Sequence, residues 1–457
     1  MKTNMVNRNM IGRGNRPAND PIDIPHCFPY VLVGDTKWGK GKNMKEHNRI
    51  ARKITIVLFL SQSLSSAGFI AAFTVNALVG VDLSGQKAMA GLPGAVYVVG
   101  QAFGAMVWGF SMERIGRRGG IALGQVFGVI GSAIAMSAVV GRSLPLFLMG
   151  LVLVGMARSA VDLGRFAAAE VHLPAERGRA ISHVVLGSTV GAVFGPLLVG
   201  PTGMLAQRAG FAELAGPYGV GFIGLILAAI LIFAGLRPDP RDVGRELARL
   251  YPDSVPRQRT RSLTGIVRQP GVILAMVSVV FAQMVMMVPM SITSVHMKAL
   301  HHPLSAVSLV ISVHALGMYA FSILSGRMTD RWGRGQVIIL GTVVMIVSCL
   351  MAAPSTGLVA LMVALFLLGL GWNFAYVAGS ALLADQLSPG ERAKTQGFND
   401  LLLNLTSAAS QVVSGVVYAV GGYGVMALAA ATAAFAPLTL AIWWQVSGRK
   451  ITAIPQP

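Results

Sequence analysis

The sequence predicts an all-α membrane protein with twelve transmembrane helices arranged in two six-helix bundles. Three observations support this fold: the composition, the recurrence of long apolar stretches, and a pair of loop motifs that occurs twice. Of the 457 residues, 54% are hydrophobic and only 12% are charged. That charged fraction is about half the usual value of roughly 25% for a soluble protein.

Twelve apolar stretches, each long enough or nearly long enough to cross a bilayer, are the predicted transmembrane helices. Backbone groups find no water inside a bilayer, so a spanning segment has to be a helix or part of a closed barrel. The short alternating strands of a barrel do not occur in this sequence. The predicted spans are residues 54–79, 88–111, 119–139, 143–169, 180–205, 217–236, 270–295, 304–326, 336–353, 356–384, 397–420 and 422–446.

The segments between and beyond the spans define the domain organisation. We expect a disordered cytoplasmic tail at 1–53, because it is polar and lacks the apolar core of a signal peptide. The N-terminal bundle should cover 54–236 and the C-terminal bundle 270–446. A polar linker at 237–269, rich in Arg and Pro, should join them in the cytoplasm, and residues 447–457 should form a second cytoplasmic tail.

The distribution of basic residues predicts the orientation of the chain. The formal net charge is +19, with 37 Lys and Arg residues in all. If the N-terminus is cytoplasmic, most of these fall in cytoplasmic segments, and only Lys87, Arg142, Arg208 and Lys298 lie on the opposite side. Basic residues collect in cytoplasmic loops, so both termini should be cytoplasmic. This rule explains the charge without a nucleic-acid partner, since no basic patch belongs to a soluble fold.

Two loop motifs occur in the same order in both halves. The first reads Gly, three residues, an acid, Arg, one residue, Gly, Arg, and occurs at 109–117 and 326–334. The second contains Pro-x-Glu-Arg and occurs at 174–177 and 389–392. Repeats in register indicate duplicated bundles with a pathway between them.

The first motif also carries candidate latches between conformations. These are the acid and the arginine of each copy, whose charges can pair or face a helix N-terminus. They are Glu113, Arg114, Asp330 and Arg331.

The duplicated first motif resembles the signature loop of the major facilitator superfamily, and the resemblance covers residues 54–446. It implies two bundles that rock about a central site and expose it to each side in turn. We therefore expect a secondary active transporter that is a monomer in the lipid bilayer, carries a small solute and has no cofactor. An enzyme is not expected, since the sequence has neither a phosphate-binding loop nor a nucleophile elbow.

Methionine and histidine side chains on two successive spans suggest a path for a soft metal ion. Met286 and Met290 are four residues apart in the seventh span, and His314 and Met318 have the same spacing in the eighth. Residues four apart share a helix face, and antiparallel helices would place Met286 and His314 at similar depth. Thioether and imidazole ligands suit Cu(I), although methionine also fills gaps in apolar cores.

Met-x-x-x-Met followed by His-x-x-x-Met resembles the CcoA-type copper importers, a bacterial branch of this superfamily. The resemblance implies a copper importer of the bacterial inner membrane that supplies cytochrome oxidase assembly. The metal ligands would be Met286, Met290, His314 and Met318, and copper would be the transported substrate.

Two alternatives to copper import follow from other residues. A proton-coupled transporter of an organic solute, either a drug exporter or a riboflavin-like vitamin importer, would use the aromatic residues Trp372, Phe374 and Tyr376. A non-transporting copper receptor is the second alternative, although the sequence has no appended signalling domain.

Charged residues inside predicted spans are the candidates for ion coupling, because charge inside a membrane is costly and usually functional. Asp162 lies four residues after Arg158 and three before Arg165, so the three should form an ion cluster on one helix. Asp400 should lie near the N-terminus of the eleventh helix, where the helix dipole favours an acid.

Overall fold

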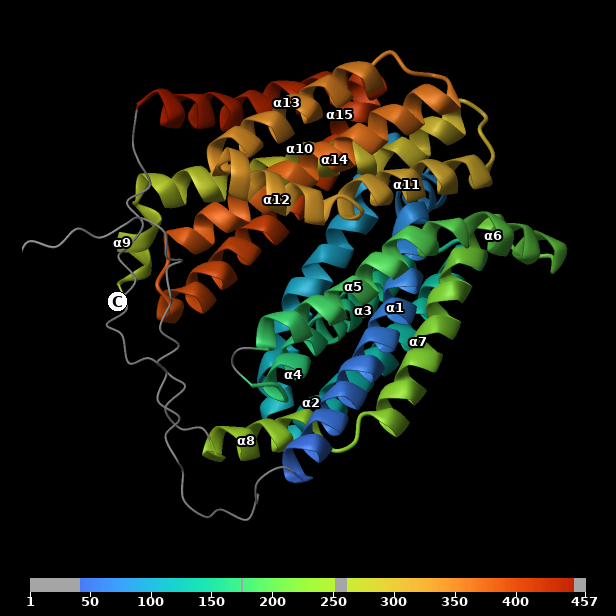
Figure 1. Ribbon diagram of the computed structural model, residues 1–457. Coiled ribbons are helices and arrows are strands. Elements are labelled where there is room, and N and C mark those ends of the chain that lie inside the picture. The colour runs from blue at the N-terminus through green and yellow to red at the C-terminus, as the bar shows by residue number, and fades with distance from the viewer. Residues whose placement is uncertain (1–41, 174–175, 251–260, 448–457) are drawn as a thin grey trace, which may run out of the picture. The chain divides into compact units, whose positions relative to one another are not determined.

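The computed structural model describes residues 42–173, 176–250 and 261–447, and their elements are helices without any strand (Figure 1). The N-terminal half consists of α1 (Lys42–Ser84), η1 (Lys87–Gly91), α2 (Leu92–Val140), α3 (Leu144–Asp162), α4 (Gly164–Glu170), α5 (Arg177–Leu197), α6 (Val199–Arg208), η2 (Glu213–Ala215) and α7 (Gly216–Gly235). The linker contains α8 (Pro240–Leu250) and α9 (Leu263–Val267). The C-terminal half consists of α10 (Pro270–Ala299), α11 (Leu304–Tyr319), α12 (Ser322–Trp332), α13 (Arg334–Ala352), α14 (Leu358–Asp385) and α15 (Pro389–Val446).

The helices confirm the predicted twelve crossings. Ten helical stretches of the described chain are long and apolar enough to cross a membrane. Two of them, Lys87–Val140 and Lys394–Val446, are long enough for two crossings, and each contains a glycine with non-helical backbone angles at its middle, Gly116 and Gly422. Their φ angles of 83° and 73° are readily accessible only to glycine, so the chain changes direction there.

The duplicated loop motif has the same structure in both halves. Gly116 and Gly333 occupy equivalent positions of the motif, and their φ angles are 83° and 95°. The next residue of each copy is an arginine that pairs with an acid at the end of another helix. Arg117 pairs with Glu170 of α4, and Arg334 pairs with Asp385 of α14 at 3.0 Å.

The four predicted latch residues differ in their contacts, and their role as latches stays a prediction. Asp330 pairs with Arg334 at 2.7 Å, within its own loop. Glu113 and Arg114 accept hydrogen bonds from Arg241 through their backbone carbonyls. Among the described residues, the side chains of Glu113, Arg114 and Arg331 form no ion pair. In each copy of the motif the ion pair to another helix is made by the arginine after the glycine, Arg117 or Arg334.

The expected disordered tail at 1–53 is partly helical, because α1 begins at Lys42. Residues 42–53 are mostly good helix formers, such as Lys, Met, Glu, Arg and Ala, so they continue the spanning helix beyond its apolar part. Residues 1–41 lie outside the described chain. The linker at 237–269 contains two short helices, and its residues 251–260 also lie outside it, as do residues 448–457 of the expected C-terminal tail.

The two halves touch at one end, here called the outer end, which lies opposite the motif loops at Gly116 and Gly333. There η1 and the start of α2 cross α15 at backbone distance. A Cβ atom on Gly91 would lie 1.6 Å from the carbonyl oxygen of Gln411, so only glycine allows this approach. An ion pair of 3.4 Å between Lys298 and Glu213 also joins the halves.

The end that carries the motif loops, here called the inner end, is built differently. Its ion pairs, as far as the chain is described, join residues within a half or join the linker to the nearer half. Arg261 of the linker pairs with the buried Glu391 at 2.7 Å and holds the pKa of that carboxyl well below its usual value. The structure is therefore closed at the outer end, and at the inner end no ion pair between the described residues joins the two halves.

We predict that Gly91→Val opens the outer end, because the valine side chain would force α15 away from η1. Ser294 is 3% exposed and lines the small cavity beside Gly94 and Gln411. Ser294→Cys, in a chain with Cys27→Ser and Cys349→Ser, reports on this opening. The introduced thiol should react with maleimide roughly tenfold faster when Gly91→Val is present, because a small change in free energy is enough to shift the population of the open state tenfold. Gly357→Val is the control, because its Cβ would meet nothing within 4 Å. Equal labelling rates in both variants would contradict the prediction.

Candidate functional site

A cavity of about 640 Å³ lies between the two halves. It is lined by side chains of α1 to α5 on one side and of α10, α11, α14 and α15 on the other. It extends from Met290, which also borders the outer contact, to the exposed Gln396 of α15. The cavity is therefore sealed at the outer end and reaches the surface towards the inner end. Its volume is in the range that holds a drug-sized molecule.

The C-terminal half lines the cavity with aromatic rings. Trp372 and Tyr376 of α14 are stacked, with ring centroids 4.7 Å apart and an interplanar angle of 24°. Tyr319 of α11 meets Trp372 edge-on at 6.4 Å. The indole N–H of Trp372 donates to Gln283 Oε1 at 3.0 Å, and the amide of Gln283 donates to Ser407 at 3.1 Å. These bonds fix the ring plane, so the wall offers a flat apolar surface with polar edges.

The N-terminal half contributes charge. The expected ion pair between Arg158 and Asp162 is present, with 3.0 Å between Nε and Oδ2. Gln62 and Gln101 also donate to the Asp162 carboxylate, at 3.2 Å and 3.3 Å. Three donors from three helices thus surround one carboxylate. Both charged side chains are largely buried, and Arg158 lies on the cavity wall.

Arg165 is not part of this cluster, contrary to expectation. The helix breaks at Leu163, between α3 and α4, so the spacing of a continuous helix does not apply. The Arg165 guanidinium instead lies 4.9 Å from the ring centroid of Phe166, and its Nε is buried without a hydrogen-bond partner. Arg165 lines the cavity, where its charge is available to a solute.

Asp400 lines the cavity from the opposite half and accepts a hydrogen bond from Gln396 at 3.0 Å. The prediction that Asp400 lies near the N-terminus of its helix is wrong. α15 begins at Pro389, and Glu391 occupies the first turn in a capping box with Ser388. The helix starts earlier than predicted because a polar capping sequence precedes the apolar span.

The predicted metal ligands fall into two groups. Met286, Met290 and Met318 line the cavity. His314 is fully buried and faces α14, where its Nδ1 lies 2.7 Å from the carbonyl oxygen of Leu365. A carbonyl only accepts, so Nδ1 carries the proton and Nε2 has a free lone pair. That Nε2 is buried and has no partner.

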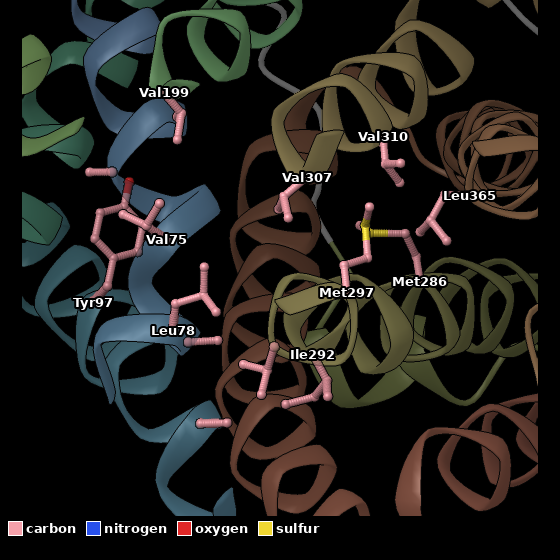
Figure 2. Close-up of a cluster of buried hydrophobic side chains, with 14 of the residues drawn as sticks. Val75, Leu78, Tyr97, Val199, Met286, Ile292, Met297, Val307, Val310 and Leu365 are labelled. Carbon is pink, nitrogen blue, oxygen red and sulfur yellow. The ribbon is translucent and has the colours of Figure 1, made fainter. Parts of the chain in front are cut away.

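Met286 also belongs to the apolar core. It is 1% exposed and packs in one cluster with Val307, Val310 and Leu365, as Figure 2 shows. The side chain thus contacts both the cavity and the helices that surround His314. The packing of Met286 is that of a core residue, and His314 does not line the cavity with the three methionines.

Several cavity residues were not anticipated from the sequence. Gln101 and Gln283 line the cavity, and Gln62 lies behind it. Each is an amide inside an apolar span and bonds to a charged or aromatic group at or near the wall. A polar side chain in a predicted span is the signal that could have found them, because the bilayer makes such residues costly.

Two helical halves around a central cavity, closed at one end only, define a transporter that works by alternating access. The chain belongs to the Major Facilitator Superfamily, whose family model matches residues 58–297 and 274–453. It is therefore a multi-pass membrane protein and a secondary transporter.

Relatives span most of the chain. It is 34% identical to the uncharacterized MFS-type transporter YddS of Bacillus subtilis (strain 168), over 88% of this chain and 92% of the relative. It is 29% identical to the riboflavin transporter RfnT of Brucella anthropi, over 80% of this chain and 89% of the relative. The solved structure of the nucleoside transporter NupG aligns with a TM-score of 0.63 at 16% identity, over 88% of this chain and 99% of that chain. This last likeness concerns the fold alone.

Proposed function

We propose that the protein imports an organic solute with a planar aromatic ring system, such as a flavin, across the bacterial inner membrane, with its inner end in the cytoplasm. The single observation that supports this most is the stacked Trp372–Tyr376 wall of the central cavity. The similarity to a protein named riboflavin transporter, along most of both chains, supports the same class of solute.

The size and chemistry of the cavity favour such a solute. A volume of about 640 Å³ is far larger than an ion requires and suits a drug-sized molecule. A flat ring can stack on the aromatic wall. Polar groups at the ring edge can reach Gln283 and Ser407 on the C-terminal side and Gln101 and Arg165 on the N-terminal side. A drug exporter would use the same wall, and the direction of flux separates the two.

We predict that Trp372→Ala lowers kcat/KM for uptake of radiolabelled riboflavin into proteoliposomes by roughly tenfold, because the variant loses one stacking surface. Trp372→Phe should retain more activity, since it keeps the ring and loses only the bond to Gln283. Trp332→Ala is the matched control, because Trp332 is 54% exposed and lies outside the cavity. Absence of riboflavin uptake by the native protein would reject the flavin, and an unaffected Trp372→Ala variant would reject the wall as the binding surface.

We propose proton coupling at Asp162. Its carboxylate is held by Arg158, Gln62 and Gln101, so its protonation would release the arginine towards the cavity. Arg165 and Asp400 line the cavity from opposite halves and are candidates for an ion pair that forms when the inner end closes.

We predict that Asp162→Asn abolishes accumulation driven by a proton gradient but leaves exchange of labelled for unlabelled solute in place, since exchange needs no net proton movement. Asp82→Asn is the control, because Asp82 pairs with Arg142 in an exposed position outside the central cavity. Uphill transport that survives in Asp162→Asn would rule out this carboxylate as the coupling site.

Copper is a second candidate substrate, favoured by the unpartnered Nε2 of His314. A neutral imidazole that donates Nδ1–H to a carbonyl has the tautomer of a typical metal ligand. Met286, Met290 and Met318 offer soft sulfur atoms at the cavity wall. In this reading the protein is a CcoA-type importer that supplies cytochrome oxidase assembly.

We predict, if copper is the substrate, that Met286→Leu with Met290→Leu abolishes uptake of radioactive copper. Met276→Leu with Met345→Leu is the control, since both residues are buried methionines away from the cavity. Manganese should not be transported, because it prefers oxygen ligands to thioethers. Equal copper uptake by both double variants would end the copper proposal, and copper binding without flux would indicate a receptor.

A further inference from the structure

Three cationic side chains meet at the C-terminal end of α7. The Arg118 guanidinium donates from Nε and Nη2 to the carbonyl oxygen of Phe233, at 3.1 Å and 2.7 Å. Lys53 Nζ donates to the carbonyl oxygen of Arg237 at 3.4 Å. The guanidinium groups of Arg118 and Arg237 lie 4.7 Å and 6.0 Å from the Phe233 ring centroid. Lys53, Arg118 and Arg237 are here called the α7 cation cluster.

The α7 cation cluster has no carboxylate partner among the described residues. Carbonyl oxygens at a helix end favour a nearby cation, but this effect is modest and carries no full negative charge. The neighbouring Asp239 carboxylate accepts the backbone N–H groups of Arg117, Arg118 and Arg241, so it is already engaged by the loop. Asp239 thus brings one negative charge near the three cations, but none of their side chains forms an ion pair with a described carboxylate.

The face of α7 below the cluster is apolar and exposed. Ile223, Leu227, Ile230 and Phe233 are each 50–62% exposed. They are spaced by four, three and three residues, so they form one stripe along the helix. On a spanning helix such a stripe faces acyl chains, and it ends directly at the α7 cation cluster. In Figure 1 α7 runs beside α1, the helix that contributes Lys53.

We propose that the α7 cation cluster binds the phosphate of an anionic phospholipid, with an acyl chain along the Ile223–Phe233 stripe. The site combines a cluster of positive charges with an adjoining exposed apolar stripe, and a phospholipid has an anionic phosphate next to apolar acyl chains. Basic pockets beside membrane helices bind anionic headgroups in this way. The bound lipid would tie the end of α7 to α1 and to the loop after Arg118, and so stabilise the inner end of the N-terminal half.

The test is lipid binding to the purified full-length chain in mild detergent, measured by native mass spectrometry with dioleoyl phosphatidylglycerol and dioleoyl phosphatidylcholine. Lys53→Gln with Arg237→Gln should weaken binding of phosphatidylglycerol by roughly thirtyfold, since each basic residue near an anionic lipid contributes about one kcal/mol. Arg118 is kept because it caps α7. Lys394→Gln with Arg268→Gln is the matched control, as it removes the same two charges from exposed positions in the C-terminal half.

Each other outcome of this experiment overturns the proposal. Equal losses in the two double variants would mean that net charge alone attracts the lipid. Equal binding of phosphatidylcholine would mean that the site does not select an anion. If inorganic phosphate competes at the same concentration as the lipid, the site binds free phosphate and not a lipid. At a lipid site, Ile230→Ser should weaken the binding of phosphatidylglycerol and leave the binding of phosphate unchanged.

Discussion

The contact between η1 and α15 at the outer end determines what the rest of the structure can do. Gly91 and Gly94 let the backbone and side chain of Gln411 approach so closely that no side chain fits between them. With the halves held together there, the central cavity is open only towards the inner end. The repeated ion pairs of Arg117 and Arg334 stay within their own halves, so each bundle can move as a unit.

The two halves line the central cavity with different kinds of side chains. The C-terminal half supplies stacked rings whose planes are fixed by Gln283, while the N-terminal half supplies the Arg158–Asp162 pair and the unpaired Arg165. A solute that touches both walls would bind most strongly when the halves close around it. For the solute class proposed above, this arrangement would link binding to the movement of the two halves.

The four-residue spacing of the methionine and histidine residues predicted which side chains share a helix face, but not which neighbouring helix each one contacts. The four-residue spacing correctly predicted that Met286 and Met290 share a face, and both line the cavity. The same spacing could not predict that His314 would turn its ring towards α14, because the position of the Leu365 carbonyl depends on how two distant helices pack. An aromatic wall and three methionines therefore share one cavity, while His314 lies behind it.

The sequence by itself determined the number of crossings, the duplication of the halves and the ion pair within α3. All three follow from local properties: apolar length, a repeated glycine that adopts positive φ, and four-residue spacing along one helix. Only the tertiary structure decided that Arg165 leaves this cluster at the break after Asp162, that Asp400 faces the cavity far from its helix start, and that Gln62 and Gln101 join the site. These features depend on helix breaks and on contacts between residues far apart in the chain, which local sequence patterns do not encode.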